Sequence, residues 1–251
     1  MYITLVTTTR NRPLCFSLLE GWMQKQTKYW DQWLVINDCT EPYAYTQYQD
    51  VVHRDFFDDN KRTPYLPSIC ANWLEAIPHI KGDKIIVAED DDYYGADYIK
   101  TLSDMLDDVS LAGISRDAYY KLPSRHYKWM GNQDHASLAC TGFRREVLPH
   151  VERVCNAFRS VFIDMFLWAE WGSELFPGSR KLVPQSHKGR KLHVGMKNMP
   201  GIAGLGLGHQ KPDGWNLDHD SFKVLREWVG PEAAQVYARV WRDHFAQTVK
   251  Q

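Results

Sequence analysis

Four consecutive acidic residues, at positions 89–92, are the part of the sequence most able to do chemistry. Carboxylates this close repel one another unless a cation lies between them, and ligands that offer only oxygen favour Mg²⁺ or Mn²⁺ over zinc. If the segment is extended, Asp90 and Asp92 point to one side and Asp91 points to the other. The sequence therefore predicts that Asp92 and Asp90 hold a divalent cation, on which a nucleotide diphosphate can rest.

The residues on either side favour this interpretation over a solvated acidic loop. An aliphatic run over residues 84–88 comes immediately before the acids, and Tyr93 and Tyr94 come immediately after them. A continuous apolar run is typical of a strand that is buried on both faces. The carboxyl ends of strands in open α/β sheets face the ligand crevice, so we expect the acids at the rim of a binding site.

Two earlier strands are expected to end in the same way. Residues 3–7 and 33–36 are short, β-rich runs that lead straight into polar segments. The spacing of apolar residues predicts helices over 13–26 and 67–80, which alternate with the strands. This alternation predicts an α/β fold with a mostly parallel central sheet that is flanked by helices.

The rest of the chain is less regular. The pattern indicates helices that begin near residues 97, 145 and 162, and strands over 111–114 and 137–143. The segment 119–129 alternates aromatic and basic residues without a clear period.

A change of character near residue 180 predicts two regions, a core over 1–180 and a C-terminal extension over 181–251 packed on the same domain. No acid occurs between Leu175 and Pro212, where seven basic residues gather: Arg180, Lys181, Lys188, Arg190, Lys191, Lys197 and Lys211. A glycine-rich stretch over 199–209 predicts a loop, and the spacing of apolar residues predicts a helix over 231–248.

Composition narrows the class of protein. The chain has 251 residues and a formal net charge of -1, so no overall field favours nucleic acid or a membrane surface. Its five cysteines have no C-x-x-C spacing, which favours reduced thiols in the cytoplasm. No stretch approaches the roughly 20 apolar residues of a membrane span. We therefore expect a soluble cytoplasmic protein.

Taken together, these segments resemble the family 2 glycosyltransferases of the GT-A fold. The resemblance covers roughly the first hundred residues and rests on the order and spacing of several short motifs: Thr9-Arg10-Asn11-Arg12-Pro13, Leu18 to Thr27, Asn37-Asp38, Asn72, Gly82-Asp83 and Asp90-Asp91-Asp92. The short layout also resembles virus-encoded members. Where the family usually has paired acids after the second strand, this chain has Asn37-Asp38, which bears on the identity of the donor base.

The resemblance implies roles for particular residues. Thr8, Arg10 and Asp38 correspond to the cradle for base and ribose, and Asn72, Asp90, Asp91 and Lys197 are further candidates for nucleotide-sugar binding. Asp92, with Asp90, corresponds to the ligands of a Mn²⁺ or Mg²⁺ ion. Some members complete the metal shell with a histidine, and His193 and His209 are the two candidates.

The resemblance also implies a general base, which takes the proton from the acceptor hydroxyl. Asp164, at a helix start among bulky apolar residues, is the best match, and Glu170 and Glu174 are alternatives. The alternative to a catalytic role is that Asp164 only caps the helix or is structural.

The expected activity is therefore a metal-dependent, inverting transfer of a hexose or pentose from a nucleotide diphosphate sugar to an acceptor hydroxyl. The acceptors considered are a hydroxymethylated DNA base, a saccharide and a protein. The DNA base is included because the basic stretch could contact phosphates. Two alternatives remain open: a nucleotidyltransferase, and a non-catalytic protein that binds nucleotides or nucleic acid.

Overall fold

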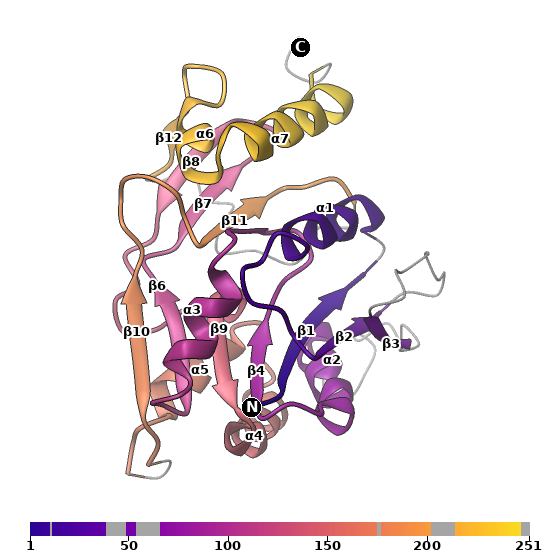
Figure 1. The fold of residues 1–251 in the computed structure, drawn as a ribbon, viewed down its shortest axis with the longest axis vertical. Coiled ribbons are helices and arrows are strands. Elements are labelled where there is room, and N and C mark those ends of the chain that lie inside the picture. The colour runs from indigo at the N-terminus through magenta and orange to yellow at the C-terminus, as the bar shows by residue number, and fades with distance from the viewer. Residues whose placement is uncertain (11, 39–48, 54–65, 175–176, 202–213, 247–251) are drawn as a thin grey trace.

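The computed structural model describes residues 1–10, 12–38, 49–53, 66–174, 177–201 and 214–246. Its centre is a seven-stranded sheet with the strand order β10-β6-β9-β4-β1-β2-β3 (Figure 1). The neighbouring strands are parallel except at β9, which runs antiparallel to both β4 and β6. The strand bounds are β1 Ile3–Thr9, β2 Gln32–Asn37, β3 Gln49–His53, β4 Lys84–Val87, β6 Leu111–Ser115, β9 Thr141–Arg144 and β10 Arg180–Pro184.

Helices cover both faces of this sheet. One group packs together on one face, and α3 contacts β4, β6 and β9 on the other (Figure 1). The packed group is α2 Ser68–Ala76, α4 Leu148–Phe158 and α5 Ile163–Glu170, and the other two helices in this part of the chain are α1 Pro13–Met23 and α3 Tyr98–Met105. Pro13 begins α1, where its missing N–H costs nothing. The predicted α/β architecture with a mostly parallel sheet is confirmed.

A second, five-stranded sheet lies beside the first, with the order β12-β8-β7-β11-β5. Its strands are β5 Tyr93–Tyr94, β7 Ala118–Lys121, β8 His126–Trp129, β11 His193–Lys197 and β12 Asn216–Leu217. The sequence pattern did not predict this sheet. The aromatic and basic segment near residue 120 forms the β7–β8 hairpin, and β7 is mostly buried, so no clean alternation of polar and apolar residues marks it.

The C-terminal helices pack over this second sheet (Figure 1). They are α6 Lys223–Val229 and α7 Pro231–His244. On α7 the predicted apolar face is buried within the molecule: the ring of Tyr237 lies 5.9 Å from that of Trp22 in α1. Core packing therefore accounts for this face.

Two features differ from the sequence expectations. The predicted strand over 137–143 is divided, because residues 138–140 form a 3₁₀ turn before β9 begins at Thr141. The expected boundary after residue 180 falls inside β10, which pairs with β6 of the large sheet. The glycine-rich loop expected over 199–209 lies mostly outside the described residues. Within the described chain, no helix is both long and apolar enough to cross a bilayer.

Candidate active site

A cavity of about 340 Å³ opens at the carboxyl ends of β1, β2 and β4. Nine side chains singled out from the sequence line it: Thr8, Arg10, Asp38, Asn72, Asp90, Asp91, Asp92, Asp164 and Lys197. They come from segments far apart in the chain, and the parallel sheet brings the ends of its strands to one edge. The sequence therefore predicted where the cavity lies, and the chemical role of each residue stays a prediction.

The end of β4 is fixed by two buried tyrosines. The amide of Glu89 donates a hydrogen bond to the hydroxyl oxygen of Tyr94 at 2.7 Å. The hydroxyl of Tyr98 lies 2.6 Å from the carbonyl oxygen of Val87. Both tyrosines follow the acidic segment, so the chain folds back and ties down the strand that delivers the acids.

The acidic segment is a turn at residues 90–91 and is not extended. The alternation expected for a strand therefore does not apply. Asp90 accepts a hydrogen bond from the Thr9 hydroxyl at 2.6 Å and lies 3.1 Å from a guanidinium nitrogen of Arg12. Asp91 instead shares a cluster with Glu89 and Asp92, in which one oxygen of each carboxylate lies within 4.8 Å of the others.

Arg12 spans the turn. One of its terminal nitrogens lies 3.1 Å from Asp90 and the other lies 2.5 Å from Asp91. This guanidinium partly neutralises two of the four acids, and its planar fork suits two carboxylates at once. Arg12 also lines the cavity. It was part of the Thr-Arg-Asn-Arg-Pro motif, but nothing in the sequence indicated this contact.

Asp92 is held by residues from β11. His193 Nε2 lies 2.9 Å from Asp92 Oδ2, and the Met196 amide donates to Asp92 Oδ1 at 2.8 Å. The Lys197 ammonium lies 3.5 Å from Asp92 Oδ1. Burial by itself raises the pKa of Asp92, but Lys197 and these hydrogen bonds outweigh it and bring the pKa below its usual value.

The pKa values of the neighbouring acids Glu89 and Asp90 are shifted upward. Burial, with the negative charge of Asp92 close by, raises the pKa of Glu89 to about 8. Burial also raises the pKa of Asp90 to about 7, although Arg12 opposes the change. Burial is the main cause of both shifts and the neighbouring acids add to it, and a cation bound among these carboxylates would favour their ionised forms.

The cluster of Glu89, Asp91 and Asp92 fits a hard divalent cation. It offers only carboxylate oxygens, which Mg²⁺ and Mn²⁺ prefer. Asp90 is engaged with Thr9 and Arg12 and is not part of this group. The fit differs from the pairing of Asp90 with Asp92 expected from an extended chain.

Asp164 lies in the first turn of α5 and lines the same cavity. Burial raises its pKa to about 6, and the nearby His135 and two backbone amides limit the rise. A carboxylate with a pKa near 6 is ionised at neutral pH and basic enough to accept a proton. Glu170, at the other end of α5, forms an ion pair with Arg153, and neither it nor Glu174 lines the cavity.

His193 is placed differently from the other predicted residues. Its side chain is fully buried beneath Asp92 and does not line the cavity. The competing His209 lies outside the described residues.

The cavity also contains residues for which the sequence gave no specific role. Glu89 was noted only as part of the acidic run. Tyr119 in β7 lies under Lys197, whose ammonium is 4.7 Å from the ring centroid. Because β7 was not predicted as a strand, Tyr119 had no place in the expected site.

The basic stretch is partly directed inward. Lys191 is buried, with its ammonium 5.0 Å from the ring centroid of Trp129, and Lys197 faces Asp92. Arg180 donates to the carbonyl of Trp168, and Lys181 lies 3.8 Å from Asp108. Lys211 lies outside the described residues. The stretch is therefore not one continuous strip of unpaired basic side chains.

At the level of sequence, the chain matches no protein-family model and none of the curated proteins. Its structure is similar to that of TarS residues 1–349 from S. aureus in complex with UDP-GlcNAc, with a TM-score of 0.52, 12% identity, and coverage of 84% of this chain and 62% of that chain. The mannosyltransferase PcManGT from Pyrobaculum calidifontis, in complex with GDP-Man and Mn²⁺, has a TM-score of 0.45, 12% identity, and coverage of 79% and 57%.

These similarities concern the fold. The chain spans 37% of the longer S. aureus TarS structure and less than two thirds of the other two. At 12% identity, the likeness to the TarS 1–349 structure shows a shared arrangement of the central sheet and its helices.

Proposed function

We propose that the protein is a glycosyltransferase that moves a sugar from a nucleoside diphosphate sugar to an acceptor hydroxyl. The observation that carries this proposal is one cavity lined both by an oxygen-only carboxylate cluster and by a separate carboxylate, Asp164, with a pKa near 6. The carboxylate cluster can hold the cation that a pyrophosphate needs, and the separate carboxylate can accept the proton of an acceptor hydroxyl. The fold shared with a protein that was solved with UDP-GlcNAc supports the same class of donor.

In this proposal the nucleoside is bound at the ends of β1 and β2. Thr8 lies near the end of β1 and Arg10 follows that strand. Asp38 follows β2, and its amide donates to the carbonyl of Thr9 at 2.9 Å. A buried carboxylate at this position can accept hydrogen bonds from a base or a ribose. Asn72 on α2 is a further polar contact within the same cavity.

The diphosphate is placed at the acidic turn, beside Lys197. Glu89, Asp91 and Asp92 are the residues that would hold a Mn²⁺ or Mg²⁺ ion, which would neutralise charge on the leaving diphosphate. Asp90 as a further ligand stays a prediction. The Lys197 ammonium, which lies 3.5 Å from Asp92 Oδ1 and 4.7 Å from the Tyr119 ring centroid, can contact phosphate oxygens bound beside the turn.

Asp164 acts as the general base. Its carboxylate accepts the proton of the acceptor hydroxyl while that oxygen forms a bond to the anomeric carbon. The bond from the anomeric carbon to the phosphate oxygen breaks, and the nucleoside diphosphate leaves with the electron pair. Attack from the side opposite the leaving group inverts the anomeric configuration, which is the stereochemical outcome we expect.

The acceptor class is tested separately from the donor. A hydroxymethylated DNA base, a saccharide and a protein all present a hydroxyl. Binding to DNA that weakens steeply between low and moderate salt would support the first, because it reports release of counterions from phosphates. If the protein does not bind DNA, or binds it equally at low and moderate salt, the expected acceptor is a saccharide or a protein.

The first experiment measures thermal unfolding with UDP or GDP, each with and without Mn²⁺. We expect stabilisation that requires both diphosphate and metal, since a ligand that binds the native state raises its stability by mass action. Asp91→Asn should remove the metal-dependent part. Equal stabilisation without metal would contradict the proposed metal cluster, and a preference for nucleoside triphosphates would favour a nucleotidyltransferase.

A further inference from the structure

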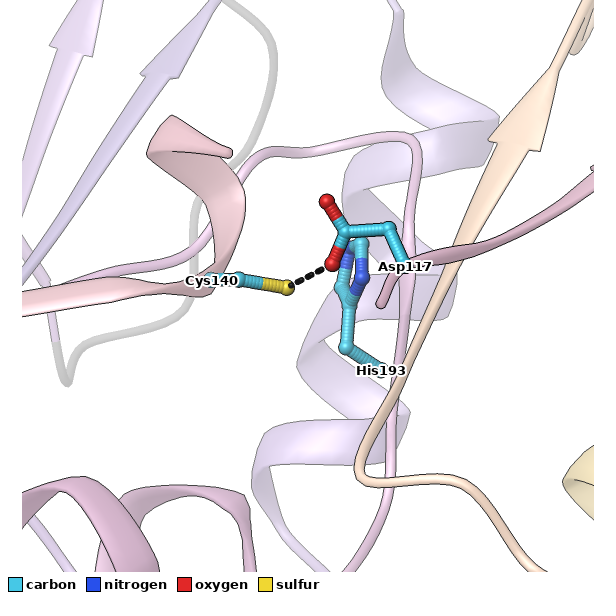
Figure 2. A group of neighbouring side chains, drawn as sticks. All are labelled: Asp117, Cys140 and His193. Carbon is cyan, nitrogen blue, oxygen red and sulfur yellow. Dashed lines mark hydrogen bonds between the residues drawn. The ribbon is translucent and has the colours of Figure 1, made fainter. Parts of the chain in front are cut away.

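A second group of possible metal ligands lies behind the cavity, at the junction of the two sheets. Asp117 follows β6, Cys140 precedes β9, and His193 begins β11. One ligand atom from each side chain lies within 4.8 Å of the other two. Figure 2 shows the ring of His193 beside the Asp117 carboxylate, toward which the sulfur of Cys140 also points. Asp117 is 1% exposed, and Cys140 and His193 are both 0% exposed.

The hydrogen bonds within this group are poorly matched. His193 Nε2 is engaged with Asp92 Oδ2 at 2.9 Å, while His193 Nδ1 is buried without a hydrogen-bond partner in the described chain. The Asp117 carboxylate accepts from the Cys140 thiol at 3.2 Å, and the Asn132 amide lies 3.5 Å away. A thiol is a weak donor, and a buried carboxylate or imidazole nitrogen without good partners is costly. A cation at this place would satisfy both groups.

We propose that Asp117, Cys140 and His193 hold a zinc ion. Sulfur, imidazole nitrogen and carboxylate oxygen together are typical ligands of zinc, in contrast to the oxygen-only cluster in the cavity. Zinc bonds of about 2.0–2.3 Å in tetrahedral geometry require ligand atoms roughly 3.3–3.7 Å apart. Cys140 Sγ and Asp117 Oδ1 are already 3.2 Å apart, and all three ligand atoms lie within 4.8 Å of one another.

The charges of this site balance. Zinc displaces the proton of the Cys140 thiol, which is released to solvent, and the resulting thiolate and the Asp117 carboxylate neutralise the two positive charges of the ion. A neutral assembly is far cheaper to bury than an isolated ion. With three ligands from the protein, a water molecule completes the tetrahedron.

The same arrangement connects the zinc site to the cavity. Histidine ligands of metals commonly donate their second N–H to a carboxylate, which fixes the tautomer and the ring orientation. Here Asp92 is that carboxylate, because its Oδ2 lies 2.9 Å from His193 Nε2. The zinc site therefore positions His193, and through it Asp92, without contacting the donor.

The test begins with the metal content of the full-length protein, purified without chelators and supplied with zinc. We expect about one zinc per chain, falling to below about a tenth in Cys140→Ser. Replacement of zinc by Co²⁺ should give a near-ultraviolet charge-transfer band from thiolate to cobalt, which Cys140→Ser abolishes. Cys155→Ser, at another buried cysteine, is the matched control and should keep both the metal and the band.

Two further variants keep the proposal falsifiable. Asp117→Asn provides a second ligand substitution if Cys140→Ser does not fold, and it should also lower the zinc content. Asp91→Asn, in the cavity cluster, should keep the zinc and the band, so that failure of the donor site is distinguished from failure of the zinc site. A wild-type protein without zinc, or a cobalt band that survives Cys140→Ser, would overturn the proposal.

Discussion

Replacement of Asp164 by Asn tests the proposed base through two opposite effects. Transfer should fall by about 10²–10⁴-fold, because the variant cannot accept the acceptor proton. Donor binding should be unchanged, since Asp164 is not part of the carboxylate cluster. Wild-type kcat/KM should decrease as the pH falls through about 6, the pKa to which burial raises Asp164.

The free energy of unfolding should change with pH in the direction opposite to kcat/KM, and should increase as the pH falls. The pKa of Asp164 rises from 3.8 to about 6 on folding, so its contribution to stability is fully present below pH 3.8 and is lost as the pH rises through about 6. At 1.36 kcal/mol for each pH unit, the ionised form costs at most about 3 kcal/mol at neutral pH. Solvent screening of this partly exposed side chain reduces the figure to roughly 1–2 kcal/mol.

Asp164→Asn should therefore unfold at a temperature several degrees higher than wild type at pH 7.5, and this advantage should shrink toward pH 4. The assays are acceptor glycosylation as a function of pH and thermal unfolding in matched buffers. Glu170→Gln and Glu174→Gln are the controls, because neither residue lines the cavity. An unchanged transfer rate in Asp164→Asn, or a wild-type profile that is flat from pH 5 to pH 7, would refute the assignment.

Three other changes test the surrounding structure. Asp91→Asn should lower Mn²⁺-dependent transfer by at least about 100-fold, measured by titration with the metal, and saturation at wild-type rates would contradict this. Arg12→Gln removes the guanidinium from two carboxylates and should lower the free energy of unfolding by about 3 kcal/mol in denaturant titrations, whereas an unchanged midpoint would show that the pairing is not stabilising. Gly113→Ala places a Cβ 2.5 Å from Trp168 and should lower the free energy of unfolding by about 1–3 kcal/mol. Gly21→Ala, whose Cβ would have no atom within 4 Å, is the control and should be neutral or stabilising. Equal stabilities of the two alanine variants would contradict the packing argument.

The sequence predicted the parallel part of the fold because its signals are local. Strands β1, β2 and β4 are continuous apolar runs that end in polar residues, and the helices between them have clear spacing. These signals also located the cavity, since parallel strands bring their carboxyl ends to one edge. The direction of β9 was not predictable, because an isolated apolar run is the same for either direction.

The details of the acidic turn could not be predicted from local pattern. Four acids in sequence give no indication of where the chain bends, so strand alternation predicted Asp90 beside Asp92, whereas the carboxylate cluster of the structure contains Glu89, Asp91 and Asp92. The contact between Asp92 and His193 joins residues 101 positions apart. Such a pair depends on the pairing of β5 with β11 in a sheet that the sequence pattern did not indicate.

The pairing of β11 with β5 and β7 determines when the site can form during synthesis on the ribosome. The partners that orient Asp92 belong to residues 193–197, which emerge about a hundred positions after the acids that they hold. A nascent chain that ends at residue 180 contains the acids but not the imidazole, amide and ammonium that orient Asp92. The environment of Asp92 in the cavity is therefore completed late in translation, when the second sheet closes against the first.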